Sequence, residues 1–421
     1  MNANNTSFQE RPVRNRAALK AAARCVVALC LLAAALSPQV VRGLGVRIPN
    51  QDPEAIARGN AFAATADNPS ALYYNPAGIT QLDGYNIQVG VLNYLGINTT
   101  YESPVNGTHH TKFHVIPVPE VYFTGKIPDS KFSYGLGVYA PFGLGDEWPD
   151  DSGFRSIALT AKLQYITLNP VIAYKVLPSL SLAVGPTFNY SKIDIKQGLI
   201  APGDQLQFTG SGISYGFNAG ALWQPHEKWS FGANFRSTSR MDYSGTTYYN
   251  GAPAHTTMQV QFPTIISGGI SFRPTPKWNI EADVDWTDWN SVKTLTLSGT
   301  SALFGADLPL ALNWHESFFY ELGVTRYFDD GWYVSAGYFF SGETARDKYW
   351  NPGIPDTDLH VASAGFGRKG EHWRWNVAGQ LIAGPSRPIN NSQPNPFTGQ
   401  SANGTYRLFV PTVSVSVGYH F

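Results

Sequence analysis

Side chains of opposite character alternate along the chain from about residue 84 to its end, and this alternation limits the fold more than any other feature. In WNIEADVDW, residues 278–286, apolar residues occupy the even positions and polar or acidic residues the odd ones. Successive side chains of a β-strand point to opposite faces, so the pattern predicts strands with one apolar and one polar face. A soluble sandwich would turn the aromatics into its core, whereas a membrane barrel would turn them to lipid and the acids to the lumen.

The number of strands and the lengths of their connections favour the barrel. Short links such as PDSK (128–131) and PHEK (225–228) alternate with long ones such as 289–316. Tight turns at one end and long loops at the other are typical of outer-membrane barrels, in which closure satisfies every backbone N–H and C=O. We therefore predict an all-β fold, a 14-stranded antiparallel transmembrane β-barrel. Its strands are expected to begin near Tyr85, Val115, Phe132, Ala161, Leu180, Ser211, Trp229, Pro263, Trp278, Ser317, Trp332, Asp358, Trp373 and Thr412.

The tryptophans and the last strand support a membrane location. An aromatic girdle is expected where a barrel meets the membrane surface. The final segment, TVSVSVGYHF, alternates and ends on Phe421, which resembles the C-terminal recognition signal of barrels inserted by the outer-membrane assembly machinery. That machinery is therefore a predicted partner, acting through Phe421. The tryptophans that flank the short turns are Trp223, Trp229, Trp278, Trp332 and Trp373.

Residues 1–43 are predicted to be a secretory signal peptide, cleaved between Ser37 and Leu44. Basic residues precede an apolar run from Cys25 to Leu36, which is too short to cross about 30 Å of hydrocarbon as a helix. The two cysteines of the chain, Cys25 and Cys30, both lie there, so the mature chain would have no thiolate metal site or disulfide. The mature chain would carry 24 basic and 29 acidic residues, a balance that does not suggest nucleic-acid binding.

Residues 44–84 precede the first strand and are predicted to form an N-terminal hatch inside the barrel of residues 85–421. A 14-stranded barrel is wider than the roughly eight-stranded barrel that its own side chains can fill. The segment is rich in small residues, has a helix-like stretch near Glu54 to Ala64, and continues into Asn-Pro turns. Irregular backbone is tolerated at membrane depth where protein surrounds it.

Four stretches carry a resemblance to a known family: ARGNAFAATADNPSALYYNPAGIT (57–80), YAPFGLGDEWPDDSGFR (139–155), PDTDLHVASAGFG (355–367) and the terminal GYHF. In this order they resemble the FadL/TodX-type outer-membrane transporters of long-chain fatty acids and other hydrophobic compounds. The resemblance implies a 14-stranded barrel with a hatch, and transport rather than catalysis. It also implies lateral exit beside an inwardly kinked third strand when the hatch rearranges.

The resemblance places a movable gate at Asn75, Pro76 and Ala77, with Phe62, Leu72, Tyr73 and Tyr74 packed nearby. The third strand is FSYGLGVYA, in which Gly135 and Gly137 are the predicted site of the kink, because glycine in a strand often marks a bend.

Two loop segments, 139–148 and 301–314, are predicted to capture apolar cargo, because exposed apolar patches often mark binding sites. Arg155 is a candidate partner for a fatty-acid carboxylate, although it could instead balance the aspartates beside it. No cofactor or metal is predicted, since the adjacent His109 and His110 have no third ligand. The predicted capture residues are Tyr139, Phe142, Leu144, Trp148, Leu303, Phe304, Leu308, Leu310 and Leu312.

The expected function is transport of hydrophobic compounds across the outer membrane, with long-chain fatty acids as cargo and outer-membrane lipid and lipopolysaccharide as surroundings. Neutral hydrocarbons or aromatics are the alternative cargo if no basic residue lines the pocket. A diffusion porin for small polar solutes is a second alternative, which the apolar hatch opposes. A hydrolase is not favoured, because the chain has no Gly-x-Ser-x-Gly motif.

Overall fold

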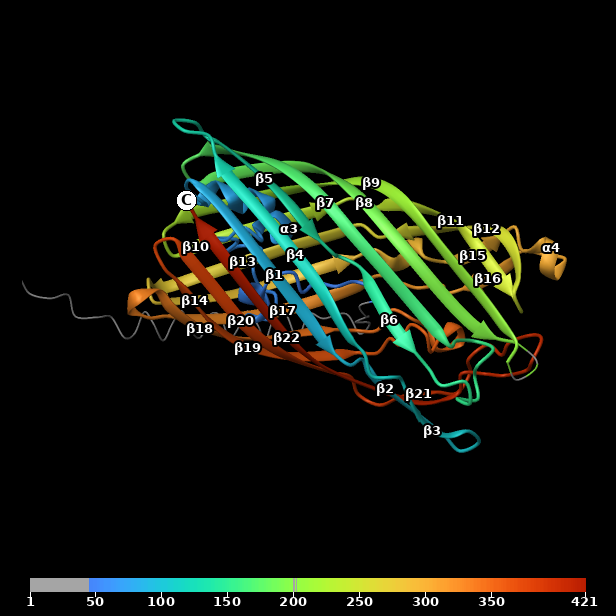
Figure 1. Cartoon of the computed structure of the whole chain (residues 1–421). Helices are drawn as coiled ribbons and strands as arrows, with labels where there is room; N and C mark the ends of the chain where they lie inside the picture. The colour runs from blue at the N-terminus through green and yellow to red at the C-terminus, as the bar shows by residue number, and fades with distance from the viewer. Residues whose placement is uncertain (1–44, 200, 202) are drawn as a thin grey trace, which may run out of the picture. The chain divides into compact units, whose positions relative to one another are not determined.

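The computed structural model describes residues 45–199, 201 and 203–421, whose strands close into an antiparallel barrel (Figure 1). The predicted signal peptide, 1–43, lies outside the described residues. Fourteen strands form the ring, and the last pairs with the first along residues 86–94, which confirms the predicted fold class. In ring order the strands are β1 (Tyr85–Leu95), β4 (Val115–Lys126), β5 (Phe132–Tyr139), β7 (Thr160–Leu177), β8 (Leu180–Gly198), β9 (Gln205–His226), β10 (Trp229–Arg236), β13 (Ile265–Thr275), β14 (Trp278–Thr287), β17 (Ser317–Tyr327), β18 (Trp332–Ser341), β19 (Leu359–Lys369), β20 (Trp373–Ala383) and β22 (Gly404–His420).

Further strands lie in the long connections, which were predicted to be loops. The clearest is the β11–β12 hairpin, turned by Asn250 (φ +47°) and Gly251 (φ +88°). Asn-Gly favours such a turn because both residues tolerate positive φ. The added strands are β2 (Asn98–Ser103), β3 (Gly107–His110), β6 (Gly143–Glu147), β11 (Ser239–Tyr249), β12 (Ala252–Phe262), β15 (Thr294–Ser298), β16 (Leu308–Ala311) and β21 (Arg387–Ile389). Short helices in the same regions and in one turn are η2 (Trp289–Ser291), α4 (Ser301–Phe304), η3 (Asp329–Gly331) and η4 (Asp347–Tyr349).

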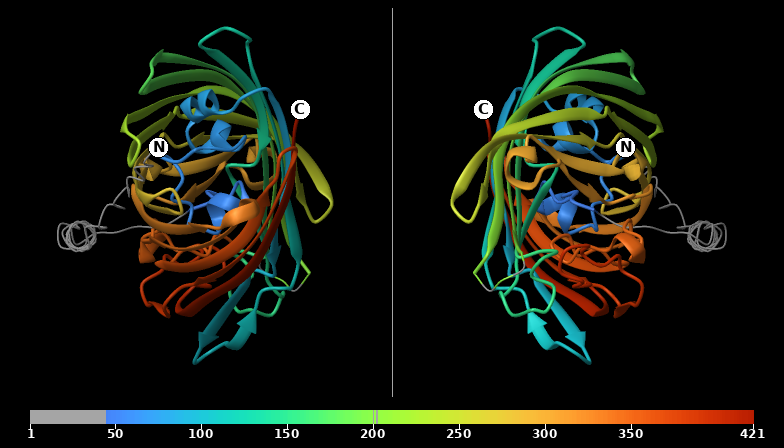
Figure 2. Two further views of the ribbon diagram at one scale, coloured as in Figure 1. Left: turned by 90° about the vertical axis from the view of Figure 1, so that its left-hand side faces the viewer. Right: turned by 90° about the vertical axis from the view of Figure 1, so that its right-hand side faces the viewer.

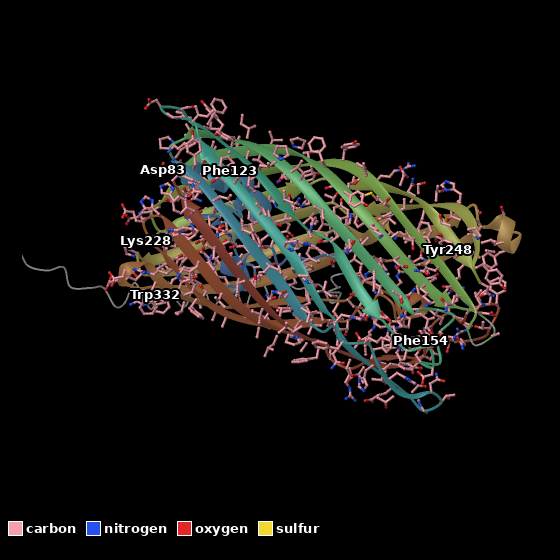
Figure 3. All side chains as sticks on the ribbon, in the orientation of Figure 1. Asp83, Phe123, Phe154, Lys228, Tyr248 and Trp332 are labelled. Carbon is pink, nitrogen blue, oxygen red and sulfur yellow. The ribbon has the colours of Figure 1, made fainter. Side chains whose placement is uncertain are left out.

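Apolar side chains cover the outside of the barrel and many polar ones face its interior, which is the reverse of a soluble protein. Val184 is 50% exposed and Phe217 is 46% exposed, whereas their neighbours on the inner face, such as Asn169 and Asn218, are fully buried. The short-turn end, which includes Trp332, lies opposite the long-loop end, which includes Phe154 and Tyr248 (Figure 3). No helix of the described ranges is long and apolar enough to cross a membrane. Exposed tryptophans at the short-turn end are Trp223, Trp278, Trp332 and Trp373.

Residues 45–82 lie inside the ring of strands (Figure 2), whereas Asp83 and Gly84 are exposed. We call residues 45–84 the hatch. It contains α2 (Pro53–Ile56), α3 (Ala71–Tyr74) and η1 (Pro76–Gln81). Of the helical stretch expected near Glu54 to Ala64, only the first turn forms, because α2 ends after four residues and the chain turns through Gly59 (φ +63°) and Asn60 (φ +64°).

Candidate functional site

The Asn-Pro-Ala motif holds the hatch to itself and to the barrel wall. The Asn75 side chain accepts a hydrogen bond from the Ala77 N–H (3.2 Å), which caps η1, and donates to Ala63 O (2.7 Å) and Ala221 O (2.9 Å). Pro76 and Ala77 are buried. A Cβ at Gly220 of β9 would lie 2.7 Å from Pro76 Cδ. The absence of a side chain at Gly220 therefore lets the motif pack against the barrel wall. The motif thus anchors the hatch in this structure.

The aromatic residues that were predicted to lie near the gate pack against one another within the hatch. Tyr73 and Tyr74 make an edge-to-face contact with ring centroids 4.9 Å apart, and Phe62 meets Tyr74 at 5.6 Å. Tyr139 also belongs here, because its ring lies 5.2 Å from Tyr73 and its hydroxyl bonds Asn169 (3.0 Å). Tyr139 was predicted to capture cargo at an outer loop, but the structure places it against the hatch.

Three carboxylates on the inner face of β14 hold the hatch, and two of them bind its backbone. Glu281 accepts hydrogen bonds from the Ala64 N–H (2.7 Å) and the Thr65 N–H (3.1 Å). Asp283 accepts from the N–H groups of Phe62 and Ala63, each at 2.8 Å.

Two arginines of the hatch pair with the same strand. Glu281 forms an ion pair with Arg58 at 2.9 Å, and neither side chain is exposed to solvent. The third carboxylate, Asp285, pairs with Arg47, which also donates to Thr287 Oγ1 (3.0 Å) and lies over the ring of Phe319. Charge and hydrogen bonding together fix the position of the hatch.

Replacing Glu281 with glutamine is expected to loosen this part of the hatch. The change leaves Arg58 buried without its counter-charge, which costs about 3–5 kcal/mol in comparable buried pairs. Hydrogen exchange of the amides of residues 62–65 should accelerate by about tenfold or more, since 1.4 kcal/mol corresponds to a factor of ten. Asp242→Asn is the matched control, because Asp242 pairs with Arg240 on the surface and such pairs contribute about 0–1 kcal/mol. Equal exchange rates in the two variants would contradict the role of Glu281.

The third strand of the ring is broken between β5 and β6. Ala140 bonds through both its N–H and its C=O to the Gln51 side chain, and Pro141 has no N–H to continue a ladder. The hatch fills the break, because the Ile48 N–H donates to Pro141 O (2.8 Å) and the Gly143 N–H donates to Val46 O (2.9 Å).

The predicted position of the kink, Gly135 and Gly137, is therefore wrong. Both glycines lie within β5 and pair with β4 and with β7. Instead, Gly135 leaves room for the hatch, since a Cβ there would lie 2.7 Å from Leu72 Cδ2. The interruption follows these glycines, at residues 140–142.

A gap in the wall lies beside the break. β4 pairs with β1 along its length, but with β5 only at residues 121–126, and no ladder in the described residues joins it to β6. Residues 115–120 of β4 are thus an edge, and Pro117 and Pro119 supply no N–H that a missing partner would leave unsatisfied. We call the opening between residues 115–120 and β6 the lateral gap.

A cavity of about 750 Å³ lies inside the barrel at this level. Its size falls within the roughly 300–1,000 Å³ usual for ligand pockets. Its lining includes Ile116 and Val118 at the lateral gap, and also Ile166 and Tyr190, each 49% exposed on the outside of the barrel. The cavity therefore continues from the interior to the outer apolar surface. Its inner wall includes Tyr94, Ile97, Phe339, Leu359, Ile382, Leu408 and Val410.

Of the residues predicted to capture cargo, Phe142 and Leu144 line this cavity. Trp148 instead packs in an aromatic cluster at the long-loop end and donates its indole N–H to Pro352 O (2.8 Å). The 301–314 segment forms α4 and β16, in which Leu303, Phe304, Leu308 and Leu310 are partly buried, and ends with Leu312 and Trp314 in the same cluster. Leu303, Phe304, Leu308, Leu310 and Leu312 are absent from the cavity lining.

Arg155 does not line the cavity. Its guanidinium pairs with Asp150 (3.0 Å) and donates to the carbonyl oxygens of Ala201 (2.9 Å) and Asp204 (3.1 Å). This position agrees with the alternative prediction, in which Arg155 balances the charge of a nearby aspartate. At the inner end of the cavity, Arg47 is already paired with Asp285.

The mouth of the cavity carries further basic residues. Glu147, at the end of β6, is shared by Lys112 (2.6 Å), His114 (3.4 Å) and Lys162 (3.4 Å). The hydrogen bond and charge of Lys112 hold the pKa of the Glu147 carboxyl below its usual value. Lys192 lines the same mouth. Among the described residues, no group of three or more His, Cys, Asp or Glu side chains is placed to hold a metal ion.

The sequence predictions missed the inner wall of the cavity and the lateral gap. The wall residues come from the long-loop ends of β1, β18, β19, β20 and β22 and from Ile97 just after β1, where apolar side chains that face inward look like any other strand residues. The gap had a usable signal, because Pro117 and Pro119 fall within an otherwise regular strand pattern and proline in a strand indicates an edge.

Comparisons with known proteins agree with this architecture. A family model described as outer membrane protein transport protein (OMPP1/FadL/TodX) matches residues 39–393. The long-chain fatty acid transport protein of Escherichia coli (strain K12) is 24% identical over 368 residues, which cover 73% of this chain and 80% of that protein. The crystal structure of a Pseudomonas aeruginosa FadL homologue superposes with a TM-score of 0.78 at 19% identity, covering 90% of this chain and all of the other. The toluene transporter TbuX of Ralstonia pickettii superposes with a TM-score of 0.65 at 15% identity, covering 88% of this chain and 98% of the other.

Proposed function

Because the chain belongs to the OMPP1/FadL/TodX family, it is an outer-membrane transporter of hydrophobic compounds and not an enzyme, and we propose that it carries long-chain fatty acids. The observation that carries the proposal is the cavity of about 750 Å³ that continues through the lateral gap to the outer apolar surface. Such a space can hold an acyl chain away from water until it reaches lipid, and the burial of apolar surface favours each step.

The proposed route begins at the long loops on the extracellular side and runs sideways. Cargo enters the cavity, contacts Phe142 and Leu144, and leaves between β4 and β6 into the membrane. The hatch closes the lumen towards the periplasm, and its residues Ile48 and Pro49 form part of the cavity wall. Filling the cavity would press on this segment, which only two backbone hydrogen bonds join to residues 141–143.

Selection by chain length rather than by charge is the expected basis of cargo choice. The apolar inner wall has no unpaired cation, because Arg47 is paired with Asp285, and the lysines that line the cavity, Lys162 and Lys192, lie at its mouth. The methyl ester of a C16 fatty acid should therefore bind within about threefold of the acid, since no charge-assisted bond is lost. Toluene should bind more weakly because it buries less apolar area. Displacement of a fluorescent fatty acid from the purified protein measures all three ligands.

The cargo experiment also separates the competing functions. Strong binding of toluene with none of the C16 acid would favour the neutral aromatic cargo named for the Ralstonia relative. A preference of more than about tenfold for the ionised acid over its ester would contradict the selection of cargo by chain length rather than by charge. Rapid sugar flux through reconstituted wild-type protein would favour the plugged porin.

A further inference from the structure

Lysines gather on the outside of the barrel at the mouth of the lateral gap. On the outer face of β8, Lys192 stands opposite Gln164 of β7 and Ser211 of β9, and Lys162 lies one row higher on β7. One row below, Ile166, Tyr190 and Ile213 are 49–61% exposed. The lysines therefore begin where the lipid-facing apolar band ends, at the level expected for lipid headgroups.

The positive charge of these lysines exceeds the negative charge of the carboxylates around them. Glu147 is shared by Lys162, Lys112 and His114. No ion pair within the described residues involves Lys192 or Lys196, and Lys192 is exposed. Asp194 adds one carboxylate, which accepts a hydrogen bond from Gln207 (2.8 Å). Lys112, Lys162, Lys192 and Lys196 thus carry four positive charges, against the two carboxylates of Glu147 and Asp194.

The same surface is part of the cavity. Lys162 and Lys192 line its mouth together with Ile166 and Tyr190, and Ile116 lines the adjoining lateral gap. An occupant with an anionic group directly above an acyl chain would match this order of basic and apolar side chains.

We propose that this outer face of β7 and β8 binds the phosphorylated headgroup of an outer-leaflet lipid, the lipid A part of lipopolysaccharide. A phosphate group lies between Lys162 and Lys192, and one acyl chain runs along Ile166 and Tyr190 to the lateral gap. A phosphate carries more charge than a carboxylate and suits several ammonium groups at once. The apolar row directly below the lysines favours a lipid over free phosphate. The bound acyl chain would cover the gap from outside when no cargo leaves.

The test uses the full-length protein in detergent and purified lipid A, with native mass spectrometry to measure binding. Lys162→Gln/Lys192→Gln removes the charges and keeps similar side-chain length. Lys131→Gln/Lys228→Gln is the matched control, because both lysines are exposed at the short-turn end. We expect lipid A binding to weaken by about tenfold or more in the first variant and to stay unchanged in the control, and added salt to reduce wild-type binding.

Two further ligands decide between sources of the anion. Dephosphorylated lipid A should bind the wild-type protein about tenfold more weakly. Equal binding of both forms, or equal binding by the two lysine variants, would overturn the proposal. Displacement of lipid A by C16 fatty acid, together with weaker fatty-acid binding by Lys162→Gln/Lys192→Gln, would assign the lysines to the cargo carboxylate and also overturn it. Fatty-acid uptake is measured separately, so these results do not depend on the proposed transport function.

Discussion

Replacing Gly232 and Gly337 with valine is expected to force the hatch from its seat and open a pore through the barrel. A Cβ at Gly232 of β10 would lie 2.7 Å from Ala64 N, and one at Gly337 of β18 would lie 2.6 Å from Arg58 O. Both contacts are with hatch backbone, which cannot move aside as a flexible side chain can. A 14-stranded barrel without its plug is wide enough to conduct ions, so planar-bilayer conductance should rise by about tenfold or more over the wild type.

The neighbouring strand supplies the matched control. Gly268 of β13 pairs with Ala233 next to Gly232, and a Cβ at Gly268 meets nothing within 4 Å. Gly268→Val should therefore stay closed. Valine is favoured in strands, so the barrel itself should fold in each variant, which the shift in gel mobility on heating reports. If the double variant conducts no more than Gly268→Val, this would contradict the idea that the hatch packs against wall positions that have no side chain.

The strands of the barrel could be predicted closely because lipid enforces the alternation of apolar and polar residues. Nine of the fourteen begin at the predicted residues, namely β1, β4, β5, β8, β10, β14, β17, β18 and β20. β9 begins at Gln205 rather than Ser211, and β22 at Gly404 rather than Thr412. These two strands continue beyond the membrane, where their ladders with β11 and with β2 do not require an apolar outer face.

The contacts inside the lumen were less predictable because they join residues far apart in the sequence. The acids of β14 were expected to face the lumen, but their partners at Arg58 and at residues 62–65 lie more than two hundred positions away. Tyr139 and Arg155 illustrate the same limit. Each is an attractive ligand-binding type next to an apolar loop, yet one packs on Tyr73 and the other pairs with Asp150.

A disulfide across the lateral gap should stop uptake of hydrophobic cargo, and a reductant should restore it. Ile116 of β4 and Gly145 of β6 face each other here, since Ile116 Cγ1 lies 3.5 Å from the position of a Cβ at Gly145. That spacing places Ile116→Cys and Gly145→Cys within disulfide reach, roughly 4 Å between Cβ atoms. Residues 45–421 contain no other cysteine, so no competing pair can form. We expect uptake of C16 fatty acid by cells to fall by about tenfold or more after oxidation, because the gap would be the exit to lipid.

The same variant separates the two ways in which cargo could leave the cavity. An exit through the lumen would need the hatch to move and would be unaffected by a bond between β4 and β6, so undiminished uptake in the oxidised variant would contradict lateral exit. Each single cysteine variant, treated identically, controls for the loss of Ile116 or Gly145 alone. Recovery after reduction excludes misfolding, because a misassembled barrel would not regain transport. The barrel should remain non-conducting throughout, since the bond lies in the wall and the contacts of Glu281 and Asp283 with the hatch are untouched.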